Sequence, residues 1–114
     1  MQPLTLSDWE TKSAQLKIEG RAFVNGAYVS AAAEAVFECV SPVDGRFLAN
    51  VASCDAADAD HAVKVARATF DAGVWSRLSP VSRKQAMLRF ADLLDQNAEE
   101  LALLETLDMG KPIS

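Results

Sequence analysis

The sequence lacks most features that mark a membrane-bound or secreted protein. Its apolar runs are only a few residues long, whereas about 20 are needed to span a bilayer. Asp8 and Glu10 stand near the N-terminus, where a secretory signal peptide carries positive charge. The two cysteines, Cys39 and Cys54, are too few for a disulfide framework, so we expect no disulfide bond. These features predict a soluble, cytoplasmic protein with no membrane partner.

The sequence also lacks an excess of basic charge and a glycine-rich nucleotide motif. It has 11 basic and 16 acidic residues, for a net charge of -5, and the basic residues are scattered, so we expect no nucleic-acid partner. No G-x-G-x-x-G motif occurs. Gly110 and Lys111 lack the flanking residues of a phosphate-binding loop and follow a predicted helix instead of preceding one. We therefore predict no cofactor-binding residue.

Candidate catalytic side chains are isolated from one another. His61 is the only histidine, and it has no second ligand or nucleophile at a helical spacing, so we interpret it as a surface or half-buried residue. Cys54 is the better of two nucleophile candidates, because it precedes a predicted helix whose dipole could lower the pKa of its thiol. Cys39 lies in a predicted strand. Neither cysteine has a histidine partner, so we predict no catalytic residue.

The first half of the chain predicts a short helix and two hairpins. Ser7 and Glu10 match a capping box for an arm helix over about 8–19, which Gly20 would end. Asn25-Gly26 between β-formers is a strong hairpin signal, because both residues tolerate positive φ. A second pair of strands, 36–40 and 46–51, flanks a turn that contains proline and glycine.

The second half predicts three helices. Asp55 caps the first, which ends at Gly73, and Ser79 caps the second, which begins at Pro80 and ends near Gln96. Asn97 begins the third, with Glu100 completing a capping box. Apolar residues at steps of three and four define one face of each of the first two helices: Ala59, Ala62, Val63, Ala66 and Phe70, then Arg83 with Met87, Phe90, Ala91 and Leu94.

The third helix is apolar on most sides, over Leu101–Leu107, and therefore needs neighbours that the other elements cannot all supply. Composition, with 50% apolar residues, otherwise suits one globular domain with a modest core, to which Trp75 contributes between helices. Gly110 and Pro112 stop the helix close to the final residue, Ser114. We expect the intact protein to contain more chain.

Asp108 is the one polar residue that stands out. It lies in the last turn of an apolar helix, where a carboxylate opposes the helix dipole unless positive charge compensates it. Lys111 or solvent could supply that compensation. The alternative is a hard cation held by this carboxylate and nearby backbone carbonyls.

Several motifs resemble the N-terminal part of NAD(P)-dependent aldehyde dehydrogenases, over about residues 21–112. They are, in order, Phe23-Val24-Asn25-Gly26, Ser41-Pro42, Gly45, Asp60-His61-Ala62-Val63, Ala66-Arg67-Ala68-Thr69-Phe70, Trp75, Arg83 and Leu104-Glu105-Thr106-Leu107-Asp108-Met109-Gly110-Lys111-Pro112. The first twenty residues, with Trp9, most resemble bacterial members that act on γ-glutamyl-γ-aminobutyraldehyde in putrescine breakdown.

The resemblance implies an α+β segment, two β-hairpins then three helices, that is an incomplete domain of an α/β aldehyde dehydrogenase fold. Residues 1–20 form an N-terminal arm, and 21–114 form the N-terminal part of the aldehyde dehydrogenase domain, which packs on a dinucleotide-binding domain. In the family a cysteine thiolate attacks the aldehyde, hydride passes to the nicotinamide, and a glutamate activates water. None of the cysteines or glutamates here matches those residues.

One family site does fall within the chain by resemblance. It holds a structural monovalent cation, K⁺ or Na⁺, with backbone carbonyls at a strand end and the aspartate before Gly-Lys-Pro. The matching residues are Cys39 or Val40, and Asp108. Relatives often carry Thr and Asn where this chain has Cys39 and Ser41, but backbone ligands are insensitive to that change. A second set of ligands lies downstream.

The sequence therefore predicts the N-terminal part of an oxidoreductase that oxidises aldehydes, of the aminoaldehyde type, to carboxylic acids with NAD or NADP. The full-length enzyme would be a homo-oligomer, and the 114-residue chain alone would be inactive. The alternative is a truncated, non-catalytic protein that binds a partner through Leu101–Leu107.

Overall fold

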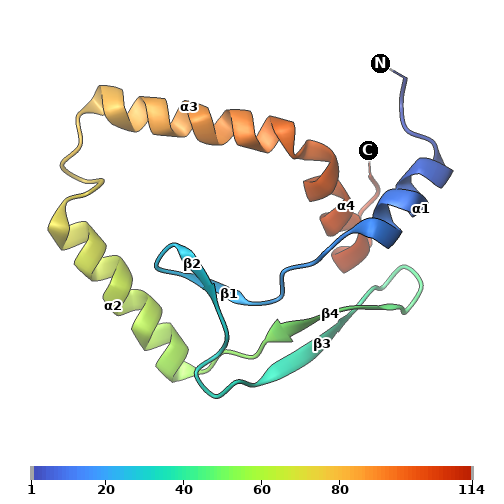
Figure 1. Ribbon diagram of the computed structural model, residues 1–114, viewed down its shortest axis with the longest axis horizontal. Coiled ribbons are helices and arrows are strands. Elements are labelled where there is room, and N and C mark those ends of the chain that lie inside the picture. Colours follow the sequence, from blue (N-terminus) through green and yellow to red (C-terminus); the bar gives the residue numbers. More distant parts are fainter. Residues whose placement is uncertain (1, 114) are drawn as a thin grey trace.

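The structure, a computed structural model, describes residues 2–113 as two hairpins and four helices (Figure 1). The elements are α1 (Leu6–Gln15), β1 (Ala22–Val24), β2 (Ala27–Val29), β3 (Val36–Val40), β4 (Phe47–Ala52), α2 (Ala56–Ala72), α3 (Pro80–Gln96) and α4 (Ala98–Met109). The helices α2, α3 and α4 form an open arc beside the hairpins, and α1 lies next to α4. The predicted order of hairpins and helices is confirmed.

Both predicted hairpins are present and antiparallel. At the first turn Asn25 and Gly26 both have positive φ, 55° and 75°, as the Asn-Gly signal requires. Phe23 lies opposite Tyr28 across this hairpin, with their ring centroids 5.2 Å apart in an edge-to-face arrangement. In the second hairpin, Cys39 pairs with Ala49 and Val40 pairs with Phe47, so the register skips one residue of β4.

Most predicted helix ends are confirmed. Ser79 caps α3 ahead of Pro80, and Gly73 and Gly110 end α2 and α4 in the left-handed conformation, with φ of 73° and 77°. Asp55 caps α2 and forms a capping box with Asp58, whose carboxylate also accepts a hydrogen bond from the Ala32 amide at 2.8 Å. These backbone donors lower the pKa of Asp58 and tie the loop before β3 to α2.

The predicted limits of the arm helix are wrong at both ends. Thr5, not Ser7, caps α1, and its capping-box partner is Asp8. The helix ends at Gln15, and residues 16–24 then alternate strictly between partly buried and exposed side chains. This period of two is that of an extended chain. Tertiary pairing explains the early end, because the carbonyl of Gly20 accepts a hydrogen bond from the Ala52 amide of β4 at 2.8 Å.

The capping box predicted at Asn97 is also absent. The Asn97 side chain makes no cap hydrogen bond to α4 and instead donates to the carbonyl of Leu93, at 2.8 Å. The backbone amide of Asn97 also donates to the Leu93 carbonyl, at 3.1 Å, so both groups of Asn97 bond to the end of α3. Asn97 alone separates α3 from α4, and the chain bends sharply there (Figure 1).

The modest core that the composition predicts is not formed. The buried apolar side chains among residues 2–113 are those of Ala31 and Leu103, and close packing between elements is confined to the interior of each hairpin. The radius of gyration is 17.8 Å, whereas about 13 Å is typical of a compact chain of this length. Trp75, expected between helices, is 44% exposed.

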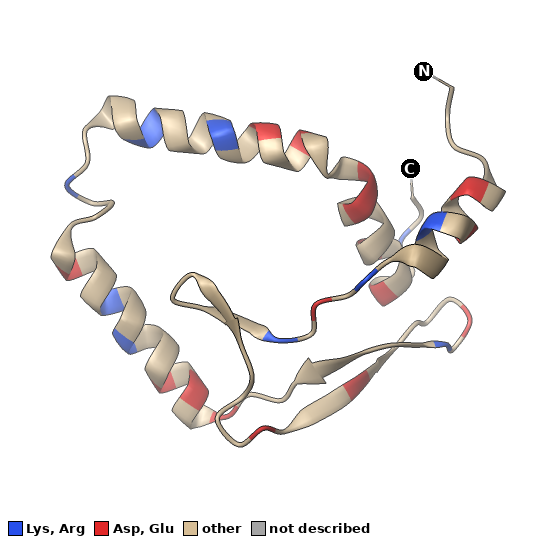
Figure 2. Ribbon diagram, in the orientation of Figure 1, with Lys and Arg blue, Asp and Glu red and all other residues tan. Residues whose placement is uncertain are grey.

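The predicted apolar faces of α2 and α3 are largely open to solvent. Val63 and Phe70 are more than half exposed, and so are Met87 and Phe90. Charged residues are spread over the helices, whereas the β1–β2 hairpin carries none (Figure 2). Among the described residues, no helix is both long enough and apolar enough to cross a membrane.

At Gly20 the backbone of the arm closely approaches the backbone of β4. A Cβ atom at this position would overlap the carbonyl oxygen of Asn50, so the arm can lie against β4 only if residue 20 has no side chain. We predict that Gly20→Ala lowers the free energy of unfolding by about 1–3 kcal/mol, as overpacking does. Chemical denaturation measures this loss, and hydrogen exchange at the Ala52 amide locates it. Lys17→Ala, at an exposed arm position, is the matched control and should change neither.

Candidate functional site

The structure brings together two residues of the predicted cation site, Cys39 and Asp108, although 69 positions separate them in sequence. Cys39 lies in β3, and Asp108 lies in the last turn of α4. The Cys39 thiol donates a hydrogen bond to Asp108 Oδ1, with Sγ and Oδ1 3.0 Å apart. The two residues line a pocket of about 300 Å³ whose other members are Glu105 and five apolar residues, Ile18, Leu48, Val51, Leu104 and Leu107.

Local irregularities in the backbone position the residues on both sides of this site. The skipped residue of β4 is Leu48, which forms a bulge opposite the step from Cys39 to Val40 and lines the pocket. A bulge interrupts the hydrogen-bond ladder, and here it does so at the two residues whose carbonyls were predicted as ligands. On the other side, the left-handed Gly110 ends α4 directly after Met109, close to the β3–β4 turn: a Cβ on Gly110 would lie 3.5 Å from Cγ of Pro42.

The carboxylate of Asp108 has a different partner from the one that its helix suggests. Lys111 was considered above as its counter-charge, but Nζ of Lys111 lies 3.4 Å from Oε2 of Glu105 instead. The hydrogen bond to Asp108 raises the pKa of the Cys39 thiol, and burial and the negative charge of Asp108 raise it further. Cys39 is therefore a hydrogen-bond donor here and not an activated nucleophile.

The donor chemistry of the site fits a hard cation only if backbone oxygens take part. Among residues 2–113, no group of three or more His, Cys, Asp or Glu side chains lies close enough to hold a metal ion. Hard cations prefer carboxylate and carbonyl oxygens, and the site offers the Asp108 carboxylate beside an interrupted strand, with Glu105 in the same pocket. This arrangement matches the predicted ligands in kind, while cation binding itself stays a prediction.

The other candidates remain apart from this site. Cys54 and His61 are exposed and line a separate pocket of about 530 Å³ beside the N-terminus of α2, next to Ala22 and Val24 of the first hairpin. Both cysteines are free thiols. Reasoning from the sequence missed Ile18 as a site residue, although the alternation of apolar Leu16 and Ile18 with charged neighbours could have indicated an extended segment.

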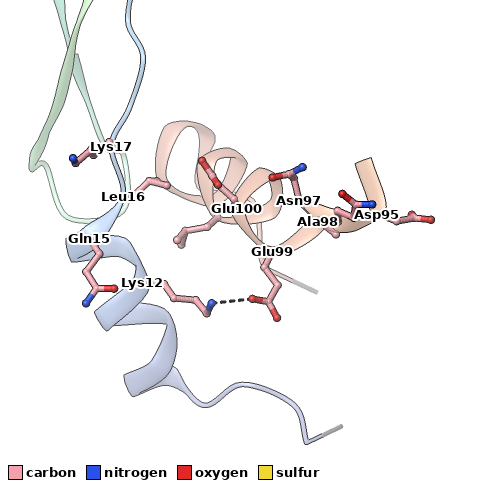
Figure 3. A pocket seen from close by; sticks show the side chains of 11 residues that line it. Lys12, Gln15, Leu16, Lys17, Asp95, Asn97, Ala98, Glu99 and Glu100 are labelled. Atoms are coloured by element: carbon pink, nitrogen blue, oxygen red, sulfur yellow. Dashed lines mark ion pairs between the residues drawn. The ribbon is translucent and has the colours of Figure 1, made fainter. Parts of the chain in front are cut away.

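A groove of about 710 Å³, lined by both charged and apolar residues, separates the arm from the start of α4 (Figure 3). Lys12 and Leu16 contribute from the arm, and Glu99 and Leu103 contribute from α4. The Lys12 ammonium group and the Glu99 carboxylate form an ion pair across the groove, with Nζ and Oε2 2.9 Å apart. The side chains are 44% and 52% exposed, so the pair is well solvated.

Comparison with known proteins identifies the family. The model of the aldehyde dehydrogenase family matches residues 28–114, which is most of the chain. The chain belongs to the aldehyde dehydrogenase family. The crystal structure of the aldehyde dehydrogenase KauB from Pseudomonas aeruginosa superposes on this chain with a TM-score of 0.96 and 71% identity, covering 97% of this chain and 22% of KauB.

Two further aldehyde dehydrogenases are similar over nearly the same span. The crystal structure of γ-glutamyl-γ-aminobutyraldehyde dehydrogenase from Burkholderia cenocepacia has a TM-score of 0.95 and 56% identity over 96% of this chain and 22% of that one. NADP/NAD-dependent aldehyde dehydrogenase PuuC from Escherichia coli is 48% identical over 95% of this chain and 22% of its own length. The chain thus spans about a fifth of these relatives. The resemblance and the predicted fold class are confirmed.

The pKa of the Cys39 thiol provides a test of the contact with Asp108. Because the carboxylate accepts the thiol proton and repels the thiolate, Asp108→Asn should lower this pKa toward its ordinary value. The midpoint of the pH profile for alkylation of Cys39 should therefore move to lower pH. Cys54→Ser removes the second thiol from the parent chain and from the variant, and Asp92→Asn, at an exposed position of α3, is the matched control. An unchanged midpoint in Asp108→Asn would show that thiol and carboxylate are not in contact.

Proposed function

We propose that this chain forms the N-terminal structural part of an NAD(P)-dependent aldehyde dehydrogenase that oxidises aminoaldehydes to carboxylic acids. The observation that carries the proposal is the superposition on KauB, with 71% identity and nearly the whole chain included. The dinucleotide is suggested by the name of PuuC, and the aminoaldehyde by the name of the Burkholderia enzyme.

In this proposal the chain contributes architecture to the enzyme and not a reacting group. The cofactor accepts the hydride in such a reaction, but residues 2–113 offer no glycine-rich cradle for a dinucleotide, so no step is assigned to them. Their contribution is apolar surface. The exposed side chains of α2 and α3, such as Phe70 and Phe90, would pack on the dinucleotide-binding domain of a homo-oligomeric enzyme.

The pocket of Cys39 and Asp108 would hold K⁺ or Na⁺ in that enzyme. The Asp108 carboxylate and the backbone carbonyl of Cys39 or Val40 would supply oxygen ligands, and the hydrogen bond from the Cys39 thiol would orient the carboxylate. The ion would also compensate a negative charge at the C-terminal end of α4, where the helix dipole disfavours it. The cation would thereby fasten α4 to the β3–β4 hairpin.

Activity distinguishes a structural segment from a catalytic unit. The 114-residue chain alone should produce no NADH from NAD⁺ and an aldehyde, because it contains neither the nucleophile nor the cofactor site. A chimera in which it replaces the corresponding segment of KauB should be active, within about ten-fold of KauB in kcat/KM.

The matched control for the chimera is KauB itself, expressed and assayed in the same way. An inactive chimera that is folded and of the same oligomeric state as KauB would contradict the structural role. NADH formation by the isolated chain above the level of buffer would contradict its assignment as non-catalytic.

Binding of the cation should also raise the thermal stability of the enzyme. In the chimera, K⁺ or Na⁺ should raise the melting temperature relative to choline at equal ionic strength, because a ligand that binds only the folded state stabilises it. Asp108→Ala should abolish this difference, whereas Asp92→Ala, at an exposed position of α3 away from the pocket, should retain it. An Asp108→Ala chimera with an unchanged response to K⁺ and Na⁺ would exclude Asp108 as a ligand.

A further inference from the structure

Within the N-terminal arm, residues 5–20 contact both sides of the Cys39–Asp108 site. We propose that this arm is a strap that holds α4 against the β3–β4 hairpin and thereby keeps Asp108 within reach of Cys39. The proposal concerns the contacts of this chain alone and does not depend on a bound cation or on the proposed enzymatic activity.

The first contact joins the arm to α4. Lys12 lies in the last turn of α1, and its ammonium group pairs with Glu99 in the first turn of α4 at 2.9 Å (Figure 3). Leu16 and Leu103 line the same groove as this ion pair, and Leu103 is only 5% exposed. Each charge also lies at the helix end that favours it, positive at a C-terminus and negative at an N-terminus.

The second contact joins the arm to the β3–β4 hairpin. The guanidinium group of Arg46, just before β4, donates a hydrogen bond to Ser13 Oγ at 2.7 Å and a longer one to the Ser13 carbonyl at 3.4 Å. Ser13 is in the last turn of α1, whose carbonyls lack intrahelical donors. Arg46 therefore caps the arm helix from the hairpin, and both hydrogen bonds are partly buried.

The third contact is the extended half of the arm, residues 16–20. The carbonyl of Gly20 pairs with the Ala52 amide, so this segment runs along β4. Two residues earlier, Ile18 lines the pocket of Cys39 and Asp108 together with Leu48 of the hairpin and Leu104 of α4. The arm, the hairpin and α4 thus meet at the pocket that contains Cys39 and Asp108.

Direct packing between α4 and the hairpin is too sparse to fix that separation. In the part of the chain that the structure describes, neither β3 nor β4 packs closely along α4. The direct links include the hydrogen bond from Cys39 to Asp108 and the approach of Gly110 to Pro42. The match to the aldehyde dehydrogenase family begins at residue 28, so the arm lies outside the matched region.

The reaction of Cys39 with iodoacetamide, a neutral reagent, tests the strap. In the 114-residue chain with Cys54→Ser, Cys39 is the only thiol. Lys12→Glu replaces an attractive pair by a repulsive one and should speed the alkylation of Cys39 by about two- to five-fold, which corresponds to the energy of an exposed ion pair. Adding Glu99→Lys restores an attractive pair with reversed sign and should return the rate to that of the parent chain.

Two controls separate the strap from a general loss of structure or a change of charge. Lys64→Glu makes the same charge change on α2 and should leave the Cys39 rate unaltered. Hydrogen exchange in the peptide 56–72 should be the same in the parent and in Lys12→Glu, whereas exchange in the peptides 36–40 and 98–109 should increase in the variant.

Three results would contradict the proposal. The first is a Cys39 that reacts in the parent chain as fast as an unstructured cysteine peptide. The second is a Lys12→Glu rate that equals the parent rate, or one that Glu99→Lys does not rescue. The third is an equal increase of exchange in all three peptides, which would assign the arm a general role in stability and not a local one.

Discussion

The structure depends on a small number of links between elements that share no common core. Each hairpin is held by its own ladder, and each helix is held by its own hydrogen bonds and caps, but the helices bury little apolar surface against anything. In a compact domain, burial of apolar surface dominates the free energy of folding, and any single polar contact adds little to it. Here little apolar surface is buried, so contacts such as those of Arg46 and Asp108 determine where the elements lie.

This constraint explains why local structure was easier to predict from the sequence than its assembly. Asn25-Gly26, Asp55, Ser79 and Gly73 act on their immediate neighbours, so the hairpin and the helix ends that they specify could be read directly. The pairing of Asp108 with the end of β3 came from family resemblance. Nothing in the local pattern relates positions 39 and 108, and physical reasoning about Asp108 alone favoured Lys111 or solvent over a cation as the compensating charge.

The errors arose where a residue could serve two purposes. Thr5 and Ser7 both begin an acceptable capping box, and the local sequence does not say which one the chain uses. Asn97 could cap the helix after it or the helix before it, and the carbonyl of Leu93 is its partner. The extended half of the arm and the open faces of α2 and α3 depend on what lies beside them in space, which the pattern along the chain does not encode.

The junction at Asn97 has a mechanical consequence. Because one residue joins two helices there, a change in the backbone dihedral angles of Asn97 would rotate α4 about its own N-terminus. Asp108 lies eleven residues from the pivot, a distance of about 16 Å at the rise of an α-helix. A rotation of about 10° at Asn97 would therefore carry the carboxylate by about 3 Å, roughly its whole separation from the Cys39 sulfur. The backbone conformation at one asparagine therefore affects the position of a carboxylate at the opposite end of the helix.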